Sequence, residues 1–330
     1  MELCVADSYR RFAEREARGQ SDISERLALG IADDPTVLAL IVRLPRRKQQ
    51  PNLLLAAARF LGAPVGDEFL TWVIDHWDRL ESMVLARSTQ TNEAARCAVL
   101  LPVLSRLTGP LALIEVGAAA GLCLYPDRYS FRYDVDGQTV ALDPVDGPSA
   151  VTIPCRIDAD SVPTALPDVR WRAGIDLNPL APGDADTRAW LRALVWPEHE
   201  ERRRRLDAAL AIAAAEPALV HRGDLVESIS DVVDAAPSGT NVVVFHSSVL
   251  VYLDPPDREQ FAEVMRSRDD VTWISNEGEN VLPRVAAQLR RPADGRTVLA
   301  VDEHPVAFVG PHGQSYDAIP REGAGSHPRV

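Results

Sequence analysis

The chain has 330 residues but only four cysteines, and Cys4, Cys97, Cys123 and Cys155 stand far apart without a Cys-x-x-Cys pair. This spacing argues against a zinc knuckle and against a disulfide framework. We therefore expect reduced thiols, most of them buried, and no metal site.

Long apolar runs are also missing from the sequence. No stretch approaches the roughly 20 apolar residues that a membrane helix needs. The first residues lack the basic and apolar regions of a signal peptide. We expect a cytoplasmic protein that has no contact with a membrane.

Positive charge is scarce relative to negative charge. The chain has 35 Lys and Arg residues against 48 Asp and Glu residues, which gives a formal net charge of −13. A surface of this sign repels phosphate backbones and anionic lipids. We therefore do not expect nucleic acid as a partner. We expect a small-molecule substrate.

Apolar residues are abundant, at 46% of the chain, which is enough for a sizeable core. Residues 5–107 have a helical pattern without strand-like alternation. Pro35, Pro51 and Pro64 fall between helical runs or at their starts, where proline is tolerated. We predict an all-helical amino-terminal region over residues 1–108.

From residue 109 the pattern changes to short apolar strands separated by helical stretches. This alternation predicts an α/β domain over residues 109–318. The last two strands are joined too tightly for a helical crossover, so they must be antiparallel. Residues 319–330, rich in Gly, Pro and charge, are expected to be a disordered tail. The expected strands are 111–116, 170–177, 218–222, 241–246, 271–275, 297–301 and 306–309.

The first of these strands carries the clearest indication of a ligand. It contains Glu115 and runs into a turn with Gly117 and Gly121. Glycines after a buried parallel strand allow a tight turn and a close approach of the backbone to a ligand. A carboxylate two residues before the first glycine repels a pyrophosphate, so we expect a cationic or polyhydroxylated ligand. S-adenosylmethionine is both.

A second acid is expected at the end of the next parallel strand, where it holds ribose hydroxyls. Asp134 lies 19 residues after Glu115 and Asp176 lies 61 residues after it. The chain before Asp134 is too short for a helical crossover, and residues 129–142 have the pattern of a hairpin around Asp136-Gly137. We select Asp176, although capping of a following helix is its alternative role.

This choice makes residues 122–170 an insertion that contains the hairpin and that could cover the pocket. The third strand ends before Asp224, which lies where an adenine amino group is expected. The same residue is also a good helix N-cap, and the two roles are compatible because a carboxylate has two oxygens.

The fourth and fifth strands bring further polar residues to the carboxyl edge of the sheet. We predict His246 and Glu277 as catalytic residues and Ser247 as a cofactor contact. A structural histidine, hydrogen-bonded at the strand end, is the alternative for His246. Hydrolase chemistry from Ser247 and His246 is disfavoured, because adjacent residues on a strand point to opposite faces.

Residues 90–96 precede a long apolar helix that leads directly into the first strand. In one interpretation Thr91 or Asn92 caps that helix. In the other, a lid over the cofactor is formed by this segment and by residues of the insertion, namely Gln90, Asn92, Glu93, Arg96, Asp127 and Arg128.

Several of these segments together resemble the domain-of-unknown-function family 2332 (DUF2332), over nearly the whole length. The resemblance implies a Rossmann-like fold of the class I methyltransferase type, with a mostly parallel sheet, an antiparallel last strand and S-adenosylmethionine as cofactor. One departure is Ala119, which stands where the general methyltransferase turn has its middle glycine. The segments that carry the resemblance are 51–55, 89–96, 115–122, 174–180, 194–197, 222–224 and 245–247.

The sequence thus predicts an S-adenosylmethionine-dependent methyltransferase with a small-molecule acceptor. Glu115 would hold the amino-acid portion, Asp176 the ribose and Asp224 the adenine. The main alternative, motivated by Ala119, is a binding protein that keeps the fold without the chemistry. A nicotinamide-dependent oxidoreductase is disfavoured by Glu115. The acceptor and the oligomeric state stay open.

Overall fold

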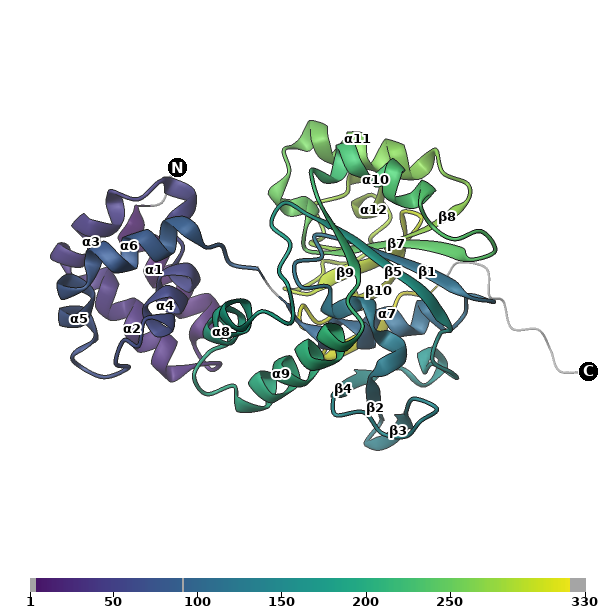
Figure 1. Cartoon of the computed structure of the whole chain (residues 1–330), viewed down its shortest axis with the longest axis horizontal. Helices are drawn as coiled ribbons and strands as arrows, with labels where there is room; N and C mark the ends of the chain where they lie inside the picture. Colours follow the sequence, from purple (N-terminus) through teal and green to yellow (C-terminus); the bar gives the residue numbers. More distant parts are fainter. Residues whose placement is uncertain (1–3, 91, 321–330) are drawn as a thin grey trace, which may run out of the picture. The chain divides into compact units, whose positions relative to one another are not determined.

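The computed structural model of the chain describes residues 4–90 and 92–320. The chain divides into two compact units, each described by itself below. A helical unit comprises residues 1–91 and 183–207, and a sheet unit comprises residues 92–182 and 208–330. Figure 1 draws residues 4–90 of the helical unit in purple to blue and residues 183–207 in teal.

The helical unit is built from short amphipathic helices, as the sequence predicts for this region. Several of them begin with a side-chain cap; for example, Ser21 accepts from the N–H of Ser24 and Asp34 accepts from the N–H of Val37. The helices are α1 (Val5–Phe12), α2 (Asp22–Asp33), α3 (Pro35–Val42), α4 (Pro51–Phe60), α5 (Phe69–Asp75), α6 (Trp77–Ala86) and α8 (Ala185–Leu194), with a π-helical segment at Ala13–Ala17.

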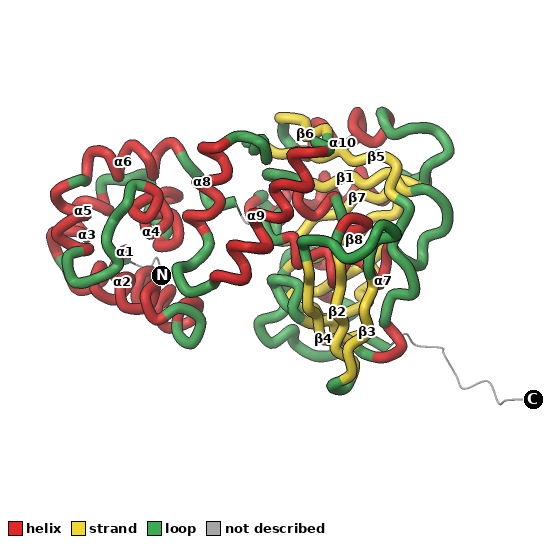
Figure 2. Tube along the Cα trace, turned by 60° about the horizontal axis from the view of Figure 1, so that its bottom comes forward, coloured by secondary structure: helices red, strands yellow, loops and turns green. Residues whose placement is uncertain are grey.

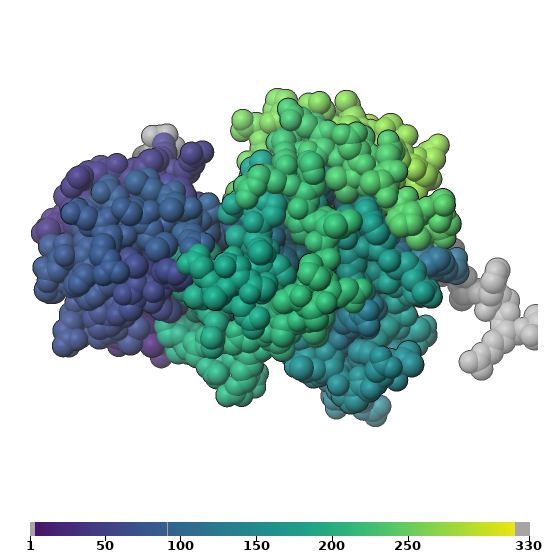
Figure 3. Space-filling view, in the orientation of Figure 1, coloured from purple at the N-terminus to yellow at the C-terminus, as the bar shows by residue number. Residues whose placement is uncertain are grey.

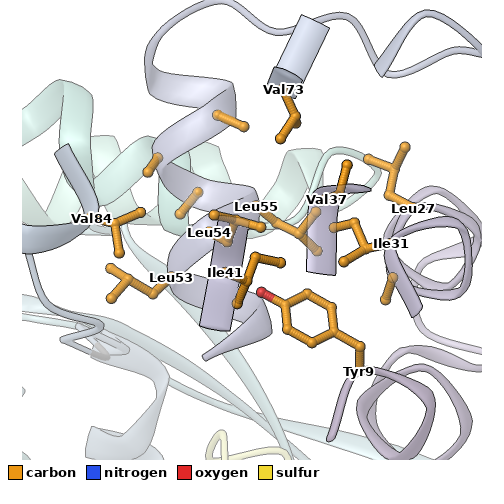
Figure 4. Packing of buried hydrophobic residues seen from close by; sticks show 14 of the residues in the cluster. Tyr9, Leu27, Ile31, Val37, Ile41, Leu53, Leu54, Leu55, Val73 and Val84 are labelled. Carbon is orange, nitrogen blue, oxygen red and sulfur yellow. The ribbon is translucent and has the colours of Figure 1, made fainter. Parts of the chain in front are cut away.

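One tyrosine hydroxyl lies inside the apolar core of this unit. Tyr9 is fully buried, and Figure 4 shows its side chain directed into the cluster that includes Ile41 and Leu54. The hydroxyl oxygen has no hydrogen-bond partner among the described residues. Burial raises the pKa of Tyr9 far above its usual range, so the hydroxyl is neutral.

Helix α8 belongs to the helical unit although it follows the first strands of the sheet in the chain. Trp190 is 1% exposed and packs edge-on against Phe60. Arg59 donates to the carbonyls of Ala193 and Val195, each at 2.6 Å, and thereby binds the carboxyl end of α8. The division of the chain therefore differs from the expected boundary at residue 108.

The sheet unit contains one sheet of eleven strands. Its strands are β1 (Leu111–Val116), β2 (Ser130–Val135), β3 (Gln138–Leu142), β4 (Thr152–Ile157), β5 (Val169–Asp176), β6 (Leu219–Arg222), β7 (Asn241–Ser247), β8 (Val271–Glu277), β9 (Thr297–Val301), β10 (His304–Val309) and β11 (Ser315–Ala318). Their order is β3-β2-β4-β11-β10-β9-β8-β7-β1-β5-β6.

The five strands β6-β5-β1-β7-β8 are all parallel to their neighbours. After β1 the chain adds β5 and β6 on one side, then returns to add β7 and β8 on the other. This reversal at β1 is the topological switch point of a doubly wound sheet, and ligands bind outside the carboxyl ends of the strands at such a point.

The remaining strands make the sheet mixed. Strands β9, β10 and β11 are successively antiparallel, as the tight link between β9 and β10 predicts. Strand β2 forms the expected hairpin with β3, and both turn residues, Asp136 and Gly137, have positive φ. The insertion does not end there, because β4 joins β2 to β11 and extends the sheet. Figure 2 shows β2, β3 and β4 side by side.

Strands β4 and β11 were not expected from the sequence. Ile319 was expected to belong to a disordered tail over residues 319–330, but its N–H donates to the carbonyl of Val306. Residues 321–330 lie outside the described part of the chain.

Helices cover both faces of the parallel strands (Figure 1). Helices α10 (Leu225–Asp234), α11 (Pro255–Arg266) and α12 (Pro283–Ala286) pack on one face through an apolar cluster that includes Ile114, Phe261 and Trp273. Figure 3 shows α10 and α11 in green at the surface. Helix α7 (Cys97–Leu104), with all its residues buried, lies on the other face, and α9 (Glu200–Ala215) runs from one unit into the other.

Candidate functional site

The polar residues that the sequence singles out gather at the carboxyl edge of the parallel strands. The register pairs Glu115 of β1 with Gly174 of β5 and with Phe245 of β7. Strands β5, β7 and β8 therefore end beside the glycine turn that follows β1. Asp176, Ser247 and Glu277 are the last residues of these three strands.

The glycine turn has left-handed backbone at three positions. Gly117 and Gly121 have φ of 72° and 68°, and Ala119 has φ of 49° although it carries a Cβ atom. A Cβ atom on Gly117 would lie 2.5 Å from a methyl group of Val249, so this glycine is required for close packing as well as for its conformation.

Every backbone N–H of the turn has a partner within the protein. The N–H groups of Gly117 and Ala118 donate to the carbonyl of Ile175, and that of Gly121 donates to the carbonyl of Ala118. The other two, at Ala119 and Ala120, donate to the side chains of Asp176 and Asn92, both at 2.8 Å. The turn thus offers no free amide to an anionic group.

Asp176 holds the turn from the end of β5. Its Oδ2 accepts from the N–H of Ala119, and its Oδ1 accepts from the N–H of Asn178 at 2.7 Å. The side chain is half-buried. Both carboxylate oxygens of Asp176 therefore bind backbone beside the glycine turn.

Asp224 lies after β6 and caps α10, as the alternative reading of the sequence predicts. Its Oδ1 accepts from the N–H of Val226 at 2.8 Å and from that of Glu227 at 3.4 Å. The residue is exposed, and no hydrogen bond engages Oδ2 within the described part of the chain. One oxygen is therefore used by the fold and the other is available.

Glu115 is 8% exposed and lies beneath the turn. Its Oε2 is buried without a hydrogen-bond partner in the described residues. Burial raises the pKa of Glu115 well above its usual range, and nearby Cys123 raises it further, whereas Arg96 lowers it. A buried carboxyl oxygen that makes no hydrogen bond is costly for the fold, and such an oxygen calls for a functional explanation.

Ser247, also buried, is part of a polar row on the same face as Glu115. Asn276 of β8 donates to Oγ of Ser247 at 3.2 Å, and Thr297 of β9 donates to Oδ1 of Asn276 at 2.5 Å. The amide of Asn276 therefore orients the serine hydroxyl. Sequence reasoning missed Asn276, although it directly precedes Glu277 in the chain.

His246 and Glu277 bind each other on the opposite face of the sheet. Nδ1 of His246 donates to Oε1 of Glu277 at 2.7 Å, and Nε2 accepts from the indole N–H of Trp273 at 3.0 Å. Because the indole can only donate, the imidazole is neutral with its proton on Nδ1. His246 is fully buried against Phe261, so neither ring nitrogen is available to a substrate in this conformation.

The carboxylate of Glu277 also fixes the loop after β7. Its Oε1 accepts from the N–H groups of Val249 at 2.9 Å and of Leu250 at 3.1 Å. Ser248, between the strand and these residues, has φ of 56°. The predicted catalytic pair therefore has a visible role in positioning the loop that packs on Gly117.

The residues predicted as a lid divide between the two units. Gln90 belongs to the helical unit and Thr91 lies outside the described residues. In the sheet unit, Asn92 binds the turn directly and Glu93 caps a short 3₁₀ helix, Ala94–Arg96. Arg96, 9% exposed, donates to the carbonyls of Ser247 and Pro311, both at 3.1 Å.

Asp127 and Arg128 of the insertion are engaged in ion pairs. Asp127 pairs with Arg172 of β5 at 2.8 Å, and Arg128 pairs with Glu216 at 2.6 Å. Arg172 also lies with its guanidinium 4.9 Å from the ring centre of Tyr125. Sequence reasoning missed Arg172, which is followed by the buried apolar part of β5, and a buried arginine needs a partner.

In residues 4–90 and 92–320, no group of three or more His, Cys, Asp or Glu side chains could hold a metal ion. Over the same residues, no helix has the length and apolar character needed to cross a bilayer.

Comparison with known proteins assigns the chain to a family without adding an activity. No curated protein and no solved structure matches the chain. A family model matches residues 6–68 and 62–317, which is most of the sequence. The chain therefore belongs to the family described as an uncharacterized protein conserved in bacteria, DUF2332.

Proposed function

We propose that this protein binds S-adenosylmethionine at the carboxyl edge of its parallel strands and transfers the methyl group to a small-molecule acceptor. One observation carries the proposal. The sheet reverses at β1, and at that point a glycine turn lies among acidic residues at or near the ends of β1, β5 and β6. Ligands of doubly wound sheets bind at this position.

The chemistry of these side chains fits a ligand with a positive charge and hydroxyl groups. Asp176 lies at the end of β5, where an acid that binds ribose hydroxyls is expected, and Oδ2 of Asp224 can accept from the adenine amino group. Oε2 of Glu115 lacks a donor within the described residues, and a ligand ammonium group supplies one. The bound cofactor would supply an electrophilic methyl group.

The residues of the chain would act mainly by binding and alignment. Asp176 and Asn92 hold the turn in one conformation through the N–H groups of Ala119 and Ala120. His246 and Glu277 hold the neighbouring loop. A binding site with a fixed backbone conformation can align two reactants for attack. Such alignment is a large part of the catalysis of bimolecular reactions.

Titration calorimetry with S-adenosylmethionine and S-adenosylhomocysteine tests the binding. Asp224→Asn is the sharpest variant, because it keeps the oxygen that caps α10 and replaces the free acceptor with a donor. We expect it to weaken binding by about 10-fold. Asp231→Asn, on the exposed side of α10, is the matched control. Absence of binding to the folded wild-type protein at millimolar ligand would refute the proposal.

A second candidate function is a binding protein that performs no methyl transfer. The engagement of His246 and Glu277 with each other favours it, since neither is then available as a general base. Incubation with S-adenosylmethionine and a panel of small nucleophiles separates the two functions. Retention of the cofactor without formation of S-adenosylhomocysteine supports the second, and methylated product supports the first.

A further inference from the structure

Arg96 presents an oriented guanidinium at the carboxyl edge of β7. Nε donates to the carbonyl of Pro311 and Nη1 donates to the carbonyl of Ser247. These two bonds fix the plane of the group. The third nitrogen, Nη2, makes no hydrogen bond to any part of the chain that the structure describes.

Glu115 points to the face of the sheet that carries Ser247, because it pairs with Phe245 of β7, two residues before the carbonyl that Arg96 binds. Glu115 and Arg96 interact electrostatically, but Oε2 of Glu115 is buried and has no hydrogen-bond partner within residues 4–90 and 92–320. Both residues are more than nine-tenths buried. The edge of the sheet therefore holds one unused acceptor and one unused cationic donor close together, with the hydroxyl of Ser247 on the same face.

An unused acceptor beside an unused cationic donor is complementary to a zwitterion with an ammonium and a carboxylate. The glycine turn cannot bind the carboxylate, because the N–H groups from Gly117 to Gly121 all have partners. The guanidinium of Arg96 interacts electrostatically with Glu115 and is a cationic donor for a carboxylate.

We propose that Arg96 and Glu115 form a site for an α-amino-acid zwitterion, in which Nη2 of Arg96 binds the carboxylate and Oε2 of Glu115 binds the ammonium group. The inference rests on the proposed function when the zwitterion is the methionine portion of S-adenosylmethionine. A free α-amino acid has the same chemistry and is the other source.

Ligands that lack one group test the site without any mutation. Calorimetry compares S-adenosylmethionine with decarboxylated S-adenosylmethionine and with methylthioadenosine, and L-methionine with 3-(methylthio)propylamine. We expect each ligand with a carboxylate to bind about 10- to 100-fold more tightly than its partner without one, which is the usual value of a charge-assisted hydrogen bond.

Variants assign the preference to the two side chains. Arg96→Gln should remove the preference for the carboxylate, whereas Arg268→Gln, at an ion pair with Asp234 and Asp270, should keep it. Glu115→Gln should weaken ligands that carry the ammonium group and leave methylthioadenosine unchanged. Thermal unfolding checks that each variant is folded. If Arg96→Gln is not folded, the ligand series with the wild-type protein decides whether the site prefers a carboxylate.

The outcomes separate this inference from the proposed function. Equal binding of S-adenosylmethionine and its decarboxylated form would overturn the inference and leave the proposed function standing. Binding of L-methionine alone, with loss in Arg96→Gln, would support the zwitterion site and overturn the proposed nucleoside ligand. Absence of binding by all five ligands would overturn both.

Discussion

At the scale of single residues, Ala119 holds a backbone conformation that glycine adopts at lower cost. Its φ of 49° lies in the left-handed region, where a Cβ atom costs roughly 1–2 kcal/mol. Its N–H is bound by Asp176, so the surrounding structure maintains the conformation. Strain of this kind is common where a fold builds a ligand site.

Ala119→Gly should therefore stabilise the folded protein. Relief of the strain exceeds the extra entropy of glycine in the unfolded chain, and we expect a gain of about 1 kcal/mol in the free energy of unfolding. Urea denaturation measures it. Ala118→Gly, at the neighbouring position without positive φ, is the control and should destabilise. A loss of stability in Ala119→Gly would contradict this account.

The buried hydroxyl of Tyr9 lowers the stability of the folded protein. Its hydroxyl is buried without a partner in the described residues, so removing the oxygen relieves a desolvation penalty. Tyr9→Phe should raise the free energy of unfolding by about 1 kcal/mol in chemical denaturation. A decrease would indicate that the hydroxyl is satisfied in solution, for example by a water molecule.

Glu115 should make stability depend on pH. Its pKa in the folded protein is raised by burial above the unfolded value of about 4.3, so the folded state favours the protonated carboxyl. The stabilisation that protonated Glu115 gives the folded protein is fully present below the pKa of the unfolded state. It is lost as the pH rises through the pKa of the folded state. Glu115→Gln should remove this loss, and its advantage over wild type should therefore grow above about pH 4. Denaturation of the ligand-free proteins between pH 4 and 8 measures the effect, and parallel pH profiles would contradict it.

At the scale of elements, the turn after β1 and the loop after β7 are packed against each other. Glu277 at the end of β8 binds the backbone of that loop, and the side chain of Val249 fills the space beside Gly117. These contacts connect the carboxyl ends of the neighbouring strands β1, β7 and β8. The position of the glycine turn depends on the loop as well as on its own backbone.

Gly117→Ala should test this contact. The new Cβ would meet Val249 at 2.5 Å and would force an alanine into positive φ, so we expect a loss of about 2 kcal/mol or more. Val249→Ala should recover part of the loss in the double variant because it removes the clash. A double-mutant cycle by urea denaturation gives the coupling. Additive effects would show that the two residues do not interact.

At the scale of the whole molecule, the helical unit is discontinuous in the chain. Residues 183–207 join it after the chain has formed β1 to β5. Trp190 belongs to the core of that unit, where it packs against Phe60, and the guanidinium of Arg87 lies 5.6 Å from its ring centre. The helices of residues 4–90 therefore depend on a segment that lies far away in sequence.

Trp190→Ala should destabilise the helical unit selectively. Truncation of a buried tryptophan costs about 3–5 kcal/mol. Hydrogen exchange should then accelerate in α4 and α8 while β1 and β7 keep their protection. Trp171→Ala, in β5, is the counterpart in the sheet unit. Uniform loss of protection in both units after Trp190→Ala would contradict the division.

The local features of this fold could be predicted from the amino-acid sequence. The apolar run that forms β1, the glycines of the turn and the hairpin at Asp136-Gly137 follow from residue type and spacing, because strand burial and positive φ are local requirements. The role of Asp224 as a helix cap is also local. For these features the pattern and the structure agree.

Contacts between segments that lie far apart in the sequence could be seen in the tertiary structure alone. Strand β4 has visible alternation of buried and exposed residues, but its pairing with β2 and β11 joins segments that no short-range pattern relates. The same holds for the hydrogen bonds that engage His246, and for the placement of Arg96 beside Glu115. Hydrogen-bond partners and burial are set by packing between segments far apart in the chain. The glycine turn was therefore predictable from the sequence, whereas the groups left free around it were not.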